Sequence, residues 1–179
     1  MKHNYSYRGE RILLRPLEEQ DIEPLRLLRN RPENRRWFFS ADEISEESQR
    51  AWYRRYALKE NDYMFAAAIP SDPTGFAGAI AVYDYRPSDN SFEVGRLLLD
   101  SGNPACRGLG KELVRGICRI VENYFPRSVC AALRAEIYNN NERSIRCFQS
   151  NGFQVCGERI EKDRRVVLLR CAVKNNETE

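Results

Sequence analysis

Residues 97–113 read LLLDSGNPACRGLGKEL, an apolar run followed by a glycine-bearing turn and then the start of a helical pattern. A strand that enters a helix through such a turn leaves the first helical N–H groups unpaired around Gly108 and Gly110. These amides and the positive end of the helix dipole attract an anion. The turn therefore predicts a binding site for a diphosphate.

The spacing of the glycines narrows the choice of diphosphate. The loop lacks the Gly-x-x-x-x-Gly-Lys-Ser/Thr spacing of a P-loop. It also lacks the third glycine of the dinucleotide-binding pattern Gly-x-Gly-x-x-Gly, because Leu113 occupies that position. Both observations argue against a nucleoside triphosphate and against NAD. A Gly-x-Gly turn also occurs as an ordinary strand-to-helix turn, so a second motif has to decide.

The second motif is residues 133–153, LRAEIYNNNERSIRCFQSNGF. Together with the upstream loop it resembles the acetyl-coenzyme A-dependent N-acetyltransferases of the GNAT superfamily. Their signature joins a Gln/Arg-x-x-Gly-x-Gly/Ala loop to Asn-x-x-Ser/Ala-Ile and a later Gly-Phe. Residues 11–17 are similar to the branch that acetylates ribosomal-protein N-termini, and residues 29–40 are similar to N-acetyltransferases of nucleotide-linked amino sugars. The resemblance covers residues 10 to 173.

The resemblance implies an α+β protein with the GNAT fold, a mixed central β-sheet of about six or seven strands flanked by about four helices. Hydrophobic periodicity in the chain fits this architecture. The expected strands are residues 10–17, 63–69, 76–85, 91–99, 129–137, 153–160 and 166–173. The expected helices are residues 21–29, 45–59, 110–125 and 141–149.

Length and composition favour a single N-acetyltransferase domain over residues 1–179, with frayed ends at 1–9 and 174–179. The chain has 29 Lys and Arg against 26 Asp and Glu, a balance too even for a nucleic-acid-binding surface. Its 6 cysteines show no Cys-x-x-Cys spacing, so we expect neither a metal site nor disulfides. With no leader-like segment and no long apolar run, we expect a cytoplasmic protein that does not contact membranes. The sequence leaves a homodimer open.

Acetyl-coenzyme A is the cofactor that the resemblance implies. Backbone N–H groups in the glycine loop would bind its pyrophosphate, and the backbone of the preceding strand would pair with its amide-rich pantetheine arm. Asn141 is expected to cap the next helix and to orient this region. The residues expected to bind the cofactor are Leu97, Leu98, Leu99, Arg107, Gly108, Leu109, Gly110, Lys111 and Asn141.

Ser144 is the candidate donor of a hydrogen bond to the leaving thiolate. Many GNAT members place a tyrosine where this chain has Phe148, which has no proton to donate. In the branch that acetylates ribosomal-protein N-termini, the serine of Asn-x-x-Ser takes the corresponding part, and Ser144 matches it. A hydroxyl can donate to a developing anion. The alternative is a serine that is present only because it suits the first turn of a helix.

Glu93 is the candidate base that takes a proton from the acceptor ammonium. It stands near the start of the strand that leads to the cofactor loop, and a carboxylate there can accept the proton directly or through water. The rivals for this role are Glu136, Glu161 and Asp163. Alternatively, Glu93 faces solvent or pairs with Arg96 or Arg134.

Arg29 and Trp37 are the candidate acceptor-binding residues. Trp37 offers a face for stacking, and Arg29 offers a partner for a phosphate. The alternative places Trp37 and Phe38 in the core. The predicted reaction is direct transfer of an acetyl group to a primary amine, either on a small molecule such as an amino sugar or on a protein N-terminus. The rival function is a non-catalytic coenzyme A-binding module.

Overall fold

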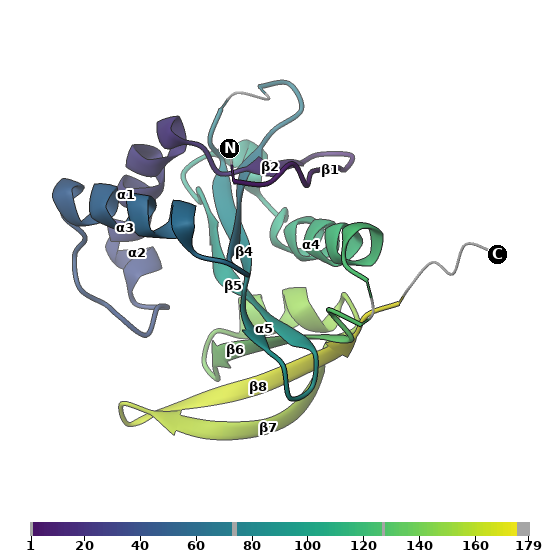
Figure 1. Cartoon of the computed structure of the whole chain (residues 1–179). Helices are drawn as coiled ribbons and strands as arrows, with labels where there is room; N and C mark the ends of the chain where they lie inside the picture. Colours follow the sequence, from purple (N-terminus) through teal and green to yellow (C-terminus); the bar gives the residue numbers. More distant parts are fainter. Residues whose placement is uncertain (1, 73–74, 127, 175–179) are drawn as a thin grey trace.

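The computed structural model describes residues 2–72, 75–126 and 128–174 of the chain (Figure 1). Its strands form one 8-stranded sheet in the order β1-β2-β3-β4-β5-β6-β8-β7. The strands are β1 (Tyr7–Arg8), β2 (Leu13–Pro16), β3 (Tyr63–Ala68), β4 (Gly78–Arg86), β5 (Ser91–Leu99), β6 (Ala132–Tyr138), β7 (Gln154–Glu161) and β8 (Arg164–Ala172). The α-helices are α1 (Ile22–Asn30), α2 (Pro32–Arg35), α3 (Glu46–Leu58), α4 (Gly110–Tyr124) and α5 (Glu142–Gln149).

The α+β architecture and its mixed sheet are those that the sequence predicts. Among the strands and α-helices, two short elements go beyond the prediction: the two-residue strand β1 and the single-turn helix α2. β5 begins and ends at the predicted residues, Ser91 and Leu99. The other predicted elements are found with shifted ends, because hydrophobic periodicity marks the middle of an element better than its ends.

Helices cover both faces of the sheet. Figure 1 shows α1, α2 and α3 on one side of β4 and β5, and α4 on the other side. On the α4 side the core includes Leu113, Ile117 and Val121, which recur every four residues on one face of the helix and are fully buried. On the other side Leu25 and Leu28 of α1 and Tyr56 of α3 pack against the sheet. Each face of β5 is therefore held by a separate hydrophobic cluster.

The N-terminal segment packs against the sheet. His3 stacks on Tyr5 with ring centroids 5.4 Å apart, and its ring lies 4.8 Å from that of Phe65. Tyr7 and Arg8 then pair with β2 as strand β1. These contacts differ from the frayed start that the sequence suggests for residues 1–9, because the aromatic rings bury themselves against β3. The tail predicted to fray lies, apart from Lys174, outside the described residues.

The part of the chain that the structure describes contains no cluster of three or more His, Cys, Asp or Glu side chains placed to hold a metal ion. Within the same residues, no helix combines the length and the apolar character that crossing a membrane requires. All 6 cysteines are free thiols.

Candidate active site

The two central strands β5 and β6 separate after a short contact. They run parallel and pair only from Ser91 to Glu93, opposite Ala132 to Arg134. On its other edge β5 pairs with β4, where the register shifts between Ala79 and Ala81. Arg96 has a φ of 50° at this irregularity, in the left-handed region that one type of β-bulge uses. Beyond Glu93, the edge of β5 that faces β6 has no strand partner among the described residues.

The separation leaves peptide groups of Leu97–Leu99 unpaired on one edge of β5. An extended, amide-containing ligand can pair with such an edge as an additional strand does. The pantetheine arm of coenzyme A is a ligand of this kind. The backbone geometry therefore fits the role that the sequence predicts for these three leucines.

The first turn of α4 lies at the end of this open edge. Its N-cap residue is Leu109, and no side chain caps the helix there. The N–H groups of the first turn therefore have no acceptor within the helix. Gly108 directly precedes the N-cap with a φ of +76°, in the left-handed region that favours glycine. The turn presents unpaired amides and a positive helix end, which is the geometry that an anionic diphosphate requires.

Arg11 supports this turn from the N-terminal segment. Its guanidinium donates to the carbonyl oxygens of Ala105, at 3.2 Å, and of Arg107, at 3.0 Å. Its backbone N–H donates to the carboxylate of Glu112 at 2.9 Å. The sequence identifies Arg11 only as part of a family resemblance. The structure gives it a physical role, because it fixes the backbone of the loop that leads into α4.

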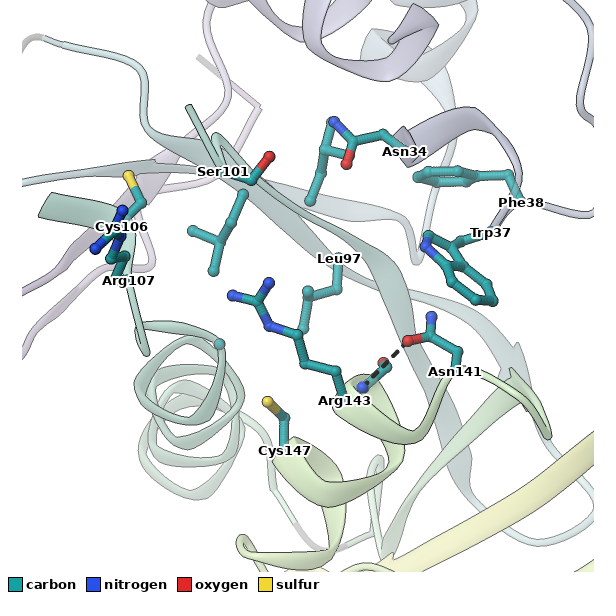
Figure 2. Close-up of a pocket in the computed structure, with 14 residues that line it drawn as sticks. Asn34, Trp37, Phe38, Leu97, Ser101, Cys106, Arg107, Asn141, Arg143 and Cys147 are labelled. Atoms are coloured by element: carbon teal, nitrogen blue, oxygen red, sulfur yellow. Dashed lines mark hydrogen bonds between the residues drawn. The ribbon is translucent and has the colours of Figure 1, made fainter. Parts of the chain in front are cut away.

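A cavity of about 300 Å³ joins the open edge of β5 to the first turn of α4 (Figure 2). Of the predicted cofactor-binding residues, its walls include Leu97, Leu98, Leu99, Arg107, Gly110 and Asn141. Gly108, Leu109 and Lys111 do not line it, and the side chain of Leu109 is fully buried in the core. We call this space the cofactor cavity.

Arg143 of α5 also lines the cofactor cavity, although the sequence did not single it out. Figure 2 shows its side chain reaching between Leu97 and Cys147. It follows Asn141 by two residues, and Asn141 accepts a hydrogen bond from the backbone N–H of Ser144 at 3.3 Å, which caps α5 as predicted. One sequence signal could have identified Arg143. It lies in the first turn of α5, and the N-cap residue of that helix, Asn141, lines the cofactor cavity.

A second cavity of about 120 Å³ adjoins the first, and we call it the acceptor cavity. Glu93 and Tyr83 line it. The two cavities share Trp37, Phe38, Leu97, Asn141 and Ser144. Residues from β5, α5 and the segment after α2 therefore meet where the two spaces join, and β4 contributes Tyr83 to the acceptor cavity. The structure brings the candidate residues Glu93, Ser144 and Trp37 together here.

Glu93 is a half-buried carboxylate without an ion-pair partner among the described residues. It accepts a short hydrogen bond from the hydroxyl of Tyr83, which lies opposite it in the β4–β5 register. Burial raises the pKa of Glu93, and the hydrogen bond from Tyr83 opposes part of this rise. The suggested pairing of Glu93 with Arg96 or Arg134 is wrong. Arg96 binds Asp62 at 2.7 and 3.0 Å, and Arg134 binds Asp84.

The rivals of Glu93 are less suited to accept a proton. Glu136 also lines the acceptor cavity, but it forms an ion pair with Arg159 at 2.6 Å. Glu161 binds the same arginine at 2.6 Å and does not line the cavity. Asp163 lies in the turn between β7 and β8, outside the cavity lining. An arginine partner stabilises the ionised form of a carboxylate and so weakens it as a base.

Ser144 stands at the junction with its hydroxyl free of hydrogen bonds to the described residues, and it lines both cavities. Phe148, one turn later in α5, is buried and packs edge-to-face on Phe153 with ring centroids 5.0 Å apart. Since the ring of Phe148 carries no donor, the Ser144 hydroxyl is the polar group that this face of α5 offers to the junction.

Trp37 and Arg29 occupy different places. Trp37 is half-buried and lines both cavities, with the Arg36 guanidinium 4.7 Å from its ring centroid. Arg29 is buried and lines a third cavity with Phe38. The structure therefore brings Trp37, but not Arg29, to the wall of the space that contains Glu93.

Two thiols, Cys106 and Cys147, border the cofactor cavity. Burial raises the pKa of each, so both are protonated near neutral pH and are poor nucleophiles. This agrees with a reaction in which no cysteine carries the acyl group.

The fold is found in many solved structures. Spermidine N-acetyltransferase from Vibrio cholerae, in complex with coenzyme A and spermine, superposes with a TM-score of 0.78 at 15% identity, over 92% of this chain and 97% of that chain. RimL, a ribosomal L7/L12 alpha-N-protein acetyltransferase in complex with coenzyme A, superposes with a TM-score of 0.76 at 14% identity, over 94% of this chain and 98% of that chain. AAC(6')-Ib, in complex with ribostamycin and coenzyme A, superposes with a TM-score of 0.73 at 19% identity, over 91% of this chain and 94% of that chain. At these identities the likeness is one of fold.

No curated protein sequence matches the chain significantly. The model of the acetyltransferase (GNAT) domain family, however, matches residues 11–154. This range contains the open edge of β5, the first turn of α4 and the whole of α5. The chain therefore belongs to the GNAT acetyltransferase family, and its enzyme class and its cofactor, acetyl-coenzyme A, are those that its sequence predicts.

Proposed function

We propose that this protein transfers the acetyl group of acetyl-coenzyme A directly to a primary amine. The amine is carried by a small molecule, such as a nucleotide-linked amino sugar, or by a protein N-terminus. The observation that carries the proposal is the junction of the cofactor and acceptor cavities, which share Ser144 and Asn141. A thioester entering from one side and an amine entering from the other would meet there.

The cofactor cavity supplies binding and orientation. The open edge of β5 at Leu97–Leu99 would hold the pantetheine arm, and the first turn of α4 would hold the pyrophosphate. When bound, acetyl-coenzyme A supplies an activated acyl group on sulfur. Fixing this group at the junction makes its encounter with the amine effectively intramolecular.

Glu93 prepares the amine for attack. An alkylammonium ion has no free electron pair, so one N–H bond must break before the C–N bond forms. Glu93 accepts that proton, and the hydrogen bond from Tyr83 fixes the direction of its carboxylate. Because burial raises the pKa of Glu93 towards neutrality, the carboxylate holds the proton more firmly than a solvent-exposed glutamate does.

Ser144 assists departure of the thiolate. As the C–N bond forms, the C–S bond breaks and its electron pair stays on sulfur. The Ser144 hydroxyl lines both cavities and donates a hydrogen bond to this developing anion. The second amine proton leaves to solvent, which completes the neutral amide.

Release of free thiol from acetyl-coenzyme A in the presence of a panel of primary amines tests the proposal. We expect thiol release with at least one amine, and no acetyl adduct on the protein by mass spectrometry when the amine is omitted. An acetylated cysteine would contradict direct transfer. Coenzyme A binding without thiol release on any amine would instead support the rival function, a non-catalytic coenzyme A-binding module.

The panel should contain small amines and short peptides with free N-termini, because the two acceptor classes differ in size. If the enzyme acetylates a peptide but none of the amino sugars, the acceptor is a protein N-terminus.

The free thiols of the chain support a reducing compartment, the cytoplasm, as the place of the reaction.

A further inference from the structure

A third cavity, of about 430 Å³, lies on the side of β5 that α1 and α3 cover. Its walls are largely apolar and include Leu25, Trp52 and Met64. Phe38 and Arg96 line both this cavity and the acceptor cavity. The third cavity is therefore a neighbour of the space that contains Glu93, and the two cavities adjoin at these two residues.

Arg29 places a positive charge in this apolar cavity. Its side chain is buried, with a residue exposure of 9%, and one guanidinium nitrogen, Nη2, donates to the carbonyl oxygen of Ser40. Its Cζ lies 3.6 Å from the centroid of the Phe38 ring. The other terminal nitrogen, Nη1, is buried and has no hydrogen-bond partner among the described residues. No carboxylate among the described residues pairs with Arg29.

A buried cation without a counter-ion is costly, and proteins usually pair such charges. Burial and, to a smaller extent, the positive charge of Arg35 together lower the pKa of Arg29 to about 10. Neighbouring arginines are arranged differently. Arg96 faces the same cavity with its charge matched by Asp62, and Arg26 on α1 binds Glu23 at 2.6 Å. Arg29 thus has the unsatisfied donor and the unmatched charge that an anionic ligand would satisfy.

We propose that the amine acceptor carries an oxyanion, a carboxylate or a phosphate, which binds Nη1 of Arg29 while the apolar part of the acceptor lies against Phe38. This inference rests on the proposed function, since it places the reacting amine of the same molecule beside Glu93. The preferred substrates are then amines with a remote negative charge. A polyamine would place a second positive charge beside Arg29 and is a poor acceptor.

Four aromatic amines, arranged as two pairs of an anionic and a neutral compound, test the inference on the wild-type protein. The acceptors are 4-(2-aminoethyl)benzoate and its neutral carboxamide, and O-phosphotyramine and its neutral parent tyramine. An ion pair with hydrogen bonds to a buried arginine predicts about 30-fold higher kcat/KM for the anionic member of at least one pair. The pair that shows the preference distinguishes carboxylate from phosphate. Equal or higher kcat/KM for both neutral amines overturns the inference.

Arg29→Gln tests the residue itself. We expect this variant to lose the preference for the anionic acceptor, mainly through a higher KM for that acceptor, so that the ratio of kcat/KM between the anionic and the neutral partner falls to about one. Arg29→Lys keeps the charge on a shorter side chain and should retain part of the preference. The matched control is Arg50→Gln, since Arg50 is exposed on α3 and pairs with Glu46 at 2.7 Å. If Arg29→Gln does not fold, the comparison of anionic with neutral acceptors on the wild-type protein still tests the inference.

A binding measurement separates this inference from the proposed function. Calorimetry with phenyl phosphate and with benzoate, which have no amine, should show binding to the wild type and at least tenfold weaker binding to Arg29→Gln. If no amine is acetylated but this binding is found, the proposed function fails and the anion site stands. If amines are acetylated without regard to charge and neither anion binds, the anion site fails and the proposed function stands.

Discussion

The cofactor cavity and the acceptor cavity are built from different parts of the polypeptide. The cofactor side relies on backbone: the unpaired edge of β5 and the uncapped first turn of α4. The acceptor side relies on side chains from distant segments, among them Trp37, Tyr83, Glu93 and Ser144. Backbone groups are present whatever the side chain is, whereas a side-chain site changes with each residue. On the proposed function, one chain would thus combine a backbone site for a constant ligand with a side-chain site that can be adapted to different amines.

The two regions should respond differently to substitution. On the acceptor side a single substitution removes a chemical group and lowers kcat. On the cofactor side a substitution matters where it disturbs the backbone, and it raises the Kd for coenzyme A. The four predictions below test this contrast, beginning with the largest expected effect.

Glu93→Gln should lower kcat by about 10³-fold, because general-base catalysis of this kind contributes two to four orders of magnitude. The Kd for coenzyme A, measured by calorimetry, should not change. The melting temperature near neutral pH should be equal to or above that of the wild type. A carboxyl group whose pKa is raised by folding destabilises the fold as the pH rises, and the amide removes this cost.

The pH profile sharpens this test. The wild-type kcat/KM should fall as the pH decreases through the pKa of Glu93, and this acid limb should lie above the ordinary glutamate range, because burial raises that pKa. Glu47→Gln, an exposed position in the first turn of α3, is the matched control and should behave as the wild type. An active Glu93→Gln variant with an unchanged acid limb would exclude Glu93 as the base.

Ser144→Ala should lower kcat by about 100-fold, since loss of one donor to a developing anion costs about two orders of magnitude. The KM for the amine should stay the same. Ser150→Ala is the control at the C-terminal end of the same helix. The Ser150 hydroxyl donates to the carbonyl of Cys147, and Ser150 lines neither the cofactor cavity nor the acceptor cavity. If steady-state kinetics show the same kcat for Ser144→Ala and the wild type, thiolate departure needs no donor at this position.

Gly108→Ala should raise the Kd for coenzyme A about tenfold and leave kcat at saturation unchanged. A φ of +76° costs a residue with a Cβ about 1 to 2 kcal/mol, so the loop would leave the conformation that presents its amides. Space is not the issue, since the nearest atom to the added Cβ is Arg11 Nη1 at 4.0 Å. Gly157→Ala is the control, where the Cβ meets Leu168 at an ordinary 3.6 Å. Equal Kd values for both variants would refute a backbone cradle.

Arg11→Gln should raise the Kd for coenzyme A by about threefold, the smallest effect in the series. The guanidinium holds two loop carbonyls, and hydrogen bonds in so exposed a position contribute at the low end of their usual range. Arg8→Gln, at an exposed residue of β1, serves as the control. A large fall in kcat for Arg11→Gln would contradict a purely structural role on the cofactor side.

The contrast between the regions also explains what the sequence can predict. A strand, a glycine turn and a helix follow one another along the chain, so the local pattern of residues 97–111 predicts the elements of the cofactor side, and the motif at residues 133–153 adds the family resemblance. The N-cap Asn141 and the break of α4 before Pro126 are local signals of the same kind. Each depends on a few neighbouring residues, and the structure contains each of them.

The acceptor side depends on register and packing. Tyr83 meets Glu93 because β4 and β5 are aligned at that pair, and the bulge at Arg96 turns that arginine towards Asp62. Neither the register nor the bulge can be read from alternation of apolar residues, since one displaced residue reverses the faces. The same limit applies to Arg29, whose separate cavity arises from the packing of α1, α3 and β5.

The brief pairing of β5 with β6 leaves a weak joint in the middle of the sheet, since it spans only Ser91 to Glu93. A coenzyme that pairs along Leu97–Leu99 would replace the missing rungs of the ladder. A ligand that binds only the folded state adds about 2.7 kcal/mol of stability at a hundredfold excess over its Kd. Resistance to unfolding and to proteolysis would therefore rise with the concentration of the coenzyme.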